Sequence, residues 1–128
     1  MVHQEQALTS FQAGKNCCQA VVEAYCEEMG ISEEEAHLLG ASYGGGNYQG
    51  LCGALAGTYI VANALEGTLD ESDPAKCQAD KAGNRIVAMT QAFEQTCGSL
   101  YCGKLIDNRP CLEYVRRALD IMEEHLAE

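Results

Sequence analysis

Both prolines of this 128-residue chain stand where the start of a helix is expected. Pro74 follows Asp73, and Pro110 comes two residues after Asn108; Asp and Asn cap helices, and proline is tolerated in the first turn. No segment shows the alternation of apolar and polar residues that is typical of a strand, and no internal repeat is visible. The sequence therefore predicts an all-α fold, a single-domain helical bundle of about five to seven helices spanning residues 1–128.

Capping residues and glycines divide the chain into expected helices. Asn16 and Ser32 precede two of them as N-caps, whereas Gly30 ends one. The expected ranges are 4–13, 17–29, 33–39, 51–66, 74–96 and a last helix from 110, with a short turn or helix over 100–106. The 51–66 helix carries several small residues, so we expect another backbone to approach it closely and expect it to be the most buried helix.

The charge balance excludes two classes of partner. Eight Lys and Arg residues against nineteen Asp and Glu residues give a formal net charge of −11, which opposes binding to nucleic acid or to an anionic membrane. The longest apolar run, 51–65, is too short to span a bilayer, and residues 1–12 lack the apolar stretch of a secretory signal. We therefore expect a cytoplasmic protein without nucleic-acid or membrane partners, and the oligomeric state stays open, with a homodimer as one option.

Eight cysteines are the main candidates for chemistry. In a reducing compartment so many thiols indicate metal, redox or catalytic use rather than structural cross-links. Four of them fall where a helix is expected to start, namely Cys17, Cys52, Cys102 and Cys111. Free backbone N–H groups and the positive end of the helix dipole favour a thiolate there. We therefore expect these four cysteines to form the functional site.

Several segments follow one another in a recognisable order. They are Asn16-Cys17 at a helix start, a Gly-rich loop, Cys52-Gly53-Ala54-Leu55-Ala56-Gly57, Gly98-Ser99-Leu100-Tyr101-Cys102, and Cys111 before Tyr114-Val115. From Phe11 to Leu119 the chain thereby resembles the C_GCAxxG_C_C family of small proteins. The resemblance implies an all-helical fold and a redox role, with Cys17, Cys52, Cys102 and Cys111 as the family's cysteines and Gly53, Ala54 and Gly57 as packing residues.

Cys52 is the expected attacking thiolate. Gly50 and Gly53 flank the start of its helix and allow a ligand or cofactor to approach, so we expect its pKa to be depressed. Disulfide exchange also needs an accessible second sulfur, for which Cys102 or Cys111 is the expected resolving thiol. The 44–50 loop should border this cluster, because it runs directly into Cys52.

Three functions remain open. The leading one is dithiol/disulfide exchange or electron transfer with a redox partner protein or a small oxidant. In the second, the same four thiolates hold zinc or an iron–sulfur cluster; a similarity to a domain of split-Soret cytochromes, which carry such a cluster, implies this option, although no C-x-x-C-H haem motif occurs. The third is a helical structural or interaction protein. The other cysteines are expected to be packed or surface thiols: Cys18, Cys26, Cys77 and Cys97.

Overall fold

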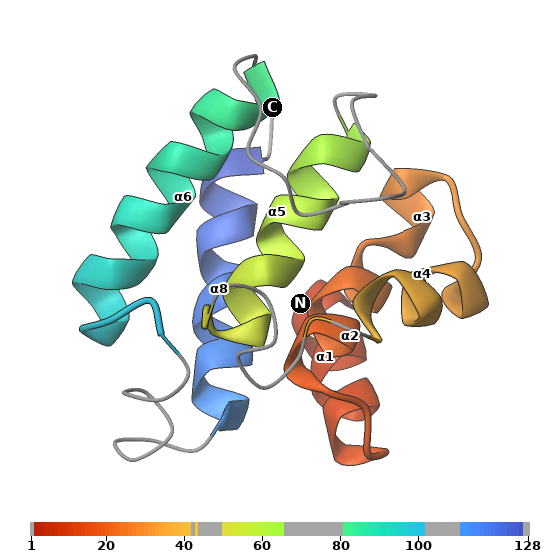
Figure 1. Ribbon diagram of the computed structural model, residues 1–128. Helices are drawn as coiled ribbons and strands as arrows, with labels where there is room; N and C mark the ends of the chain where they lie inside the picture. Colours follow the sequence, from red (N-terminus) through yellow and green to blue (C-terminus); the bar gives the residue numbers. More distant parts are fainter. Residues whose placement is uncertain (1, 42, 44–49, 66–80, 102–110, 127–128) are drawn as a thin grey trace.

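Seven helices account for most of the residues that the computed structural model describes, which are 2–41, 43, 50–65, 81–101 and 111–126. The helices are α1 (Val2–Gln12), α2 (Cys17–Ala24), α3 (Cys26–Met29), α4 (Glu33–Gly40), α5 (Gly53–Leu65), α6 (Lys81–Cys97) and α8 (Cys111–Leu126) (Figure 1). Over these ranges the only β-type pairing is an isolated antiparallel bridge between Leu51 and Tyr101. The prediction of an all-α bundle is confirmed.

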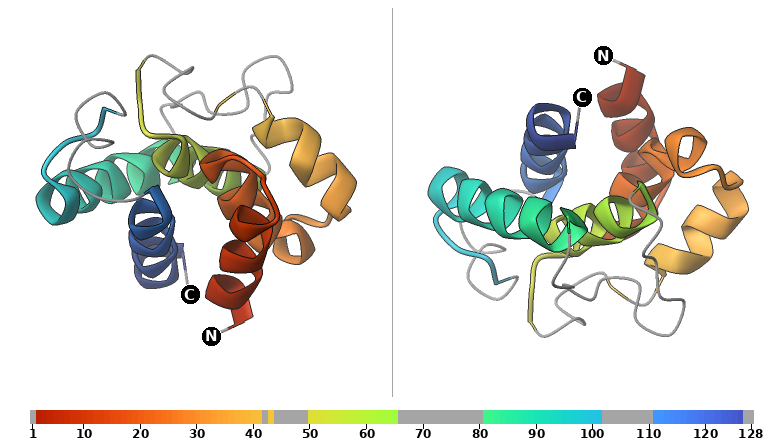
Figure 2. Two further views of the ribbon diagram at one scale, coloured as in Figure 1. Left: turned by 90° about the horizontal axis from the view of Figure 1, so that it is seen from below. Right: turned by 90° about the horizontal axis from the view of Figure 1, so that it is seen from above.

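Helix α5 runs through the middle of the bundle, with α6 and α8 on one side and α2, α3 and α4 on the other (Figure 1). Helix α2 contacts α1, α4 and α5, and α8 contacts α1, α2, α5 and α6. Figure 2 shows α1 and α8 next to each other on the face where both chain ends lie. None of the helices in the described ranges combines the length and the apolar character needed to cross a lipid bilayer.

Local capping explains where the helices on the α2 side begin and end. Asn16 and Ser32 each form a capping box, with Gln19 and Glu35 respectively, as N-caps of α2 and α4. Gly30 ends α3 in the left-handed conformation at φ 75°. These boundaries agree with the prediction from the sequence.

The expected single helix over 17–29 is wrong, because the chain leaves the helical conformation at Tyr25. The backbone there has φ −111° and ψ 12°, and the Tyr25 N–H donates to the carbonyl of Val22 at 3.1 Å, as in a tighter turn. Helix α3 then starts at Cys26. The expected starts near Pro74 and Pro110 lie outside the described residues, as does most of the 100–106 segment.

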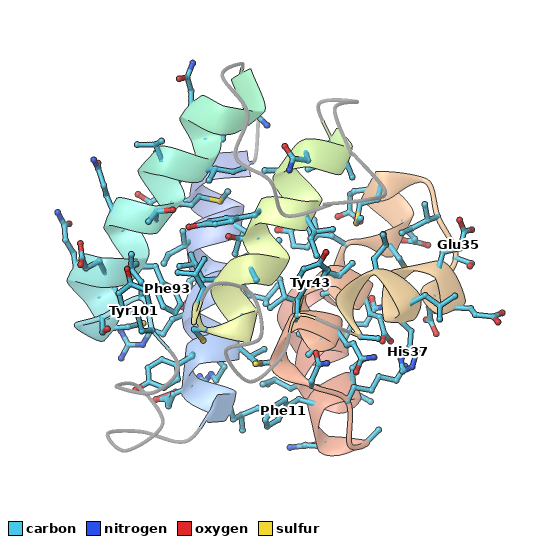
Figure 3. All side chains as sticks on the ribbon, in the orientation of Figure 1. Phe11, Glu35, His37, Tyr43, Phe93 and Tyr101 are labelled. Carbon is cyan, nitrogen blue, oxygen red and sulfur yellow. The ribbon has the colours of Figure 1, made fainter. Side chains whose placement is uncertain are left out.

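Two helices, rather than one, form the buried centre. Helix α2 is buried along its whole length, and α5 is buried from Gly53 to Asn63. The expectation that α5 alone would be the most buried helix is therefore wrong. On the far side of α5 the ring of Phe93, which is labelled in Figure 3, packs against that of Tyr114 with centroids 6.4 Å apart and joins α6 to α8.

Candidate functional site at the starts of α2 and α5

Cys17 and Cys52 form a hydrogen-bonded pair of thiols. Cys17 is the first residue of α2, and Cys52 comes immediately before α5. Both residues are buried, with exposed fractions of 8% and 5%. The direct packing of α2 against α5 thus unites two of the four cysteines that the sequence singled out.

The sulfur of Cys52 caps α5. It accepts hydrogen bonds from the backbone N–H groups of Ala54 and Leu55, the second and third residues of the helix. These are the donors that an N-cap side chain satisfies. The Cys52 N–H in turn donates to the carbonyl of Leu100 at 2.8 Å, and the Cys52 carbonyl accepts from the Ala56 N–H at 3.0 Å. The position of this thiol is therefore fixed by both its backbone and its sulfur.

The pKa of the Cys52 thiol is raised far above its ordinary value. The largest cause is the hydrogen bond with Cys17, followed by burial and by the electrostatic effect of the Cys17 thiolate form. The two helix N–H groups lower the pKa, but they are outweighed. The expectation of a depressed pKa at Cys52 is wrong, because the hydrogen bond with Cys17 and the burial of the thiol outweigh the helix N–H groups.

Asn16 holds the start of α2 on the other side of the pair. Its Oδ1 accepts from the Gln19 N–H at 2.7 Å, and its own N–H donates to Gln19 Oε1 at 2.9 Å. Its Nδ2 donates to the carbonyls of Gly40 and Ala41 at 3.3 and 3.2 Å. The residue before Cys17 therefore ties the first turn of α2 to the end of α4.

Two glycines allow the neighbouring helices to approach α2 closely. A Cβ added at Gly57 of α5 would lie 2.8 Å from the Cβ of Val21, and one added at Gly40 of α4 would lie 2.8 Å from the Cα of Gln19. Real Cβ atoms essentially never come this close to another heavy atom. The packing role that the family resemblance implied for Gly57 is confirmed for its contact with α2.

Cys18 is the packed member of the vicinal pair Cys17-Cys18. Its side chain is completely buried, and its pKa is raised by burial and, to a smaller extent, by the charge of Cys17. Cys26 and Cys97 are also buried thiols, and burial is the main cause that raises the pKa of Cys26. These residues fit the expectation of core thiols.

The remaining predicted site residues are described only in part. Cys77, Cys102 and the 44–49 loop lie outside the described residues, and of Cys111 the structure describes only its place as the first residue of α8. Gly50 has a φ of 79°, which favours glycine, and Gly53 is the buried first residue of α5. Figure 3 shows Tyr101, the residue before Cys102, at the end of the bundle where α5 starts.

The two described thiols do not by themselves suffice for zinc or an iron–sulfur cluster. Both sites take four protein ligands in their usual structural forms. Within the described residues, no three His, Cys, Asp or Glu side chains group closely enough to hold a metal ion. The metal alternative therefore requires Cys102 and Cys111 as further ligands.

A search of protein-family models places the chain among relatives. The model described as "Putative redox-active protein (C_GCAxxG_C_C)" matches residues 15–125. A search of curated proteins and a search of solved structures found no match. Among the described helices, the family match covers α2 to α6 and all but the last residue of α8, and it spans both members of the thiol pair.

Proposed function

This chain belongs to the C_GCAxxG_C_C family of redox-active proteins, and we propose that it acts by dithiol/disulfide exchange between Cys17 and Cys52. The oxidant is a disulfide of a partner protein or of a small molecule. In the net reaction the two thiols become one disulfide, and the partner's disulfide becomes two thiols. Two electrons and two protons pass from this protein to its partner.

The hydrogen bond between Cys17 and Cys52 is the observation that carries this proposal. Two thiols in such contact can be joined after a small movement, whereas cysteines with distant Cα atoms require the backbone to shift. Each thiol also stands at the start of a helix of at least eight residues, where the helix dipole stabilises a thiolate.

The attacking thiolate in this proposal is Cys17 rather than Cys52. Because its pKa is raised, Cys52 keeps its proton and donates a hydrogen bond through it to the sulfur of Cys17. Cys17, as a thiolate, attacks one sulfur of the partner's disulfide, and the first partner thiolate leaves and takes up the proton that Cys17 gave to the solvent. Cys52 then attacks the Cys17 sulfur of the mixed disulfide, and its proton passes to the second leaving thiolate.

Cys102 and Cys111 remain proposed site residues, as a second source of thiols for exchange with the pair. For Cys102, support comes from the bridge between Leu51 and Tyr101, because these residues adjoin Cys52 and Cys102 in the chain. Gly50 remains a proposed point of approach for the partner, because it is exposed and carries no side chain of its own.

Redox titration of the purified protein tests the proposal. The protein is equilibrated in glutathione buffers of defined ratio, trapped by acid, alkylated and mapped by mass spectrometry. We expect one disulfide, between Cys17 and Cys52, with the loss of two hydrogen atoms. A Cys26→Ser variant should behave in the same way, whereas Cys17→Ser and Cys52→Ser should abolish this disulfide.

Two outcomes would contradict the proposal. In the first, Cys17 and Cys52 stay open to alkylation in buffers that oxidise other protein dithiols. In the second, anaerobically purified protein contains stoichiometric zinc or iron that is lost in the Cys17→Ser variant, which would favour the four-thiolate alternative.

A further inference from the structure

We propose that Asn16 is a positioning residue for the thiol pair: it keeps Cys17 within reach of Cys52 by anchoring the first turn of α2 to the end of α4. This inference rests on the proposed exchange between the two thiols. Asn16 does not touch the partner or the reacting sulfurs in this scheme. It acts through the backbone of Cys17, the next residue in the chain.

Asn16 uses its polar groups in two directions at once. Towards α2, its Oδ1 and its N–H both bond to Gln19, at 2.7 and 2.9 Å. Towards α4, its Nδ2 bonds to two carbonyls at the end of that helix, at 3.3 and 3.2 Å. An ordinary capping residue satisfies only the donors of its own helix. Asn16 adds a connection to a second helix.

Gln19 reinforces this connection. Its Nε2 donates to the carbonyl of His37 at 3.1 Å, so its side chain joins Asn16 to the body of α4. The orientation of the amide is fixed, because Oε1 faces an N–H group and Nε2 faces a carbonyl. Gly40 leaves no side chain between α4 and the backbone of Gln19. The first turn of α2 is thus held by hydrogen bonds and by close packing.

The two thiols have separate anchors. Cys52 is held by the N–H groups of α5 and by the Leu100 carbonyl, none of which involves Asn16. Loss of the Asn16 side chain therefore loosens Cys17 and leaves Cys52 in place. The effective concentration of one thiol with respect to the other should fall, and the disulfide should form less readily.

The chain supplies a matched control in the other capping box. Ser32 caps α4 as Asn16 caps α2: its Oγ accepts from the Glu35 N–H at 3.1 Å, and its N–H lies 3.4 Å from Glu35 Oε1. Ser32 is exposed and stands at the far end of α4 from Gly40 and Ala41. Ser32→Ala therefore removes the same kind of cap without touching the connection to Cys17.

The experiment compares Asn16→Ala, Asn16→Ser and Ser32→Ala with the wild type. The equilibrium constant for the Cys17–Cys52 disulfide is measured against glutathione, and the urea midpoint of the reduced protein is measured on the same samples. We expect Asn16→Ala to lower the equilibrium constant about tenfold and Ser32→Ala to leave it within about twofold, although both lower the urea midpoint. Asn16→Ser keeps the acceptor for Gln19 and loses the donor to α4, so its equilibrium constant should lie between those of the wild type and Asn16→Ala.

The inference is overturned if Asn16→Ala changes the equilibrium constant no more than Ser32→Ala does. It is also overturned if Asn16→Ser matches the wild type, because the connection to α4 would then contribute nothing. Should Asn16→Ala fail to fold, the Asn16→Ser result decides. If the wild type itself forms no Cys17–Cys52 disulfide, the proposed function fails. If the wild type forms it and the Asn16 variants have an unchanged equilibrium constant, only the role of Asn16 fails.

Discussion

The Nζ atom of Lys15 lies 2.6 Å from the Oε1 atom of Glu23, whose side chain is only 2% exposed. The other carboxylate oxygen of Glu23 faces the Nδ1 atom of His37 at 3.5 Å, and the Ser10 hydroxyl lies 3.5 Å from Oε1. The residues that face Glu23 thus come from α1, from the α1–α2 connection and from α4. The Lys15–Glu23 ion pair therefore helps to hold these parts around α2.

Lys15→Met should destabilise the protein by about 1–3 kcal/mol, because it leaves the buried Glu23 carboxylate without its closest cation. The side chain of Lys15 is 31% exposed, so the loss should be smaller than for a fully buried ion pair. Urea unfolding of the reduced protein measures the change. Arg116→Met is the control, since Arg116 and Glu113 form an exposed pair at 3.9 Å that should contribute at most about 0.5 kcal/mol. Equal losses in the two variants would contradict this account of Glu23.

Gly57→Ala should destabilise the fold by about 1–3 kcal/mol through overpacking. The new methyl group would meet the Val21 Cβ at 2.8 Å, the Val21 Cγ1 at 2.9 Å and the Cys18 carbonyl at 3.2 Å. Val21→Ala removes one of these contacts. In the double variant Gly57→Ala/Val21→Ala the loss should therefore be smaller than the sum of the single losses, by a coupling of about 0.5 kcal/mol or more. Strict additivity in a denaturation cycle would show that the two helices do not meet as described.

Cys52→Ser should raise the stability of the reduced protein by about 0.5–1 kcal/mol. Serine is a preferred N-cap, and its oxygen accepts hydrogen bonds more strongly than the Cys52 sulfur that now caps Ala54 and Leu55. Cys52→Ala, which removes the cap altogether, should instead lower the stability by about 1 kcal/mol. Thermal and urea unfolding can rank the three proteins. A serine variant no more stable than the alanine variant would rule out capping by this side chain.

The stability of the reduced protein should fall as the pH rises above about 8.5. The pKa values of Cys18 and Cys52 are raised in the folded state, so the unfolded chain loses these protons first and binds fewer protons than the folded chain in that range. The contribution of these two thiols to the free energy of unfolding is fully present below the ordinary thiol pKa. Above it, each thiol should lower the stability by up to about 1.4 kcal/mol for every pH unit. Urea unfolding between pH 7 and pH 10, with reductant present, measures the slope. Cys18→Ala should make the slope shallower, and an unchanged slope would mean that Cys18 ionises in the folded protein as it does in the unfolded chain.

Local chemistry made much of this fold predictable. Asn16, Ser32 and Gly30 act through neighbours three to five residues away, so their effects can be read from short segments of sequence. The break at Tyr25 could not be predicted in this way, because nothing in the adjacent residues forbids a continuous helix. Helix α2, which ends at this break, packs against α1, α4 and α5. Contacts with such distant parts of the chain cannot be read from the residues next to Tyr25.

Of the candidate site, the positions of Cys17 and Cys52 at helix starts were predictable from the sequence, but their contact and their pKa values were not. Cys17 and Cys52 could be placed at helix starts, whereas their contact depends on how α2 and α5 cross. The pKa of Cys52 is raised instead of depressed, since a neighbouring thiol and burial outweigh a helix N-terminus, and the proposed order of attack therefore starts from Cys17. Gln19 and Glu23 were missed, although both stand among the apolar residues of α2, where a polar side chain must find partners inside the protein.

The capping role of the Cys52 sulfur has a consequence for laboratory evolution of this protein. A library selected only for heat resistance would favour oxygen-bearing residues over the thiol at position 52. Any stabilised descendant would then look improved by every measure of folding while lacking the chemistry proposed for it. Selection schemes for this family therefore need a sulfur-dependent survival criterion alongside the thermal one.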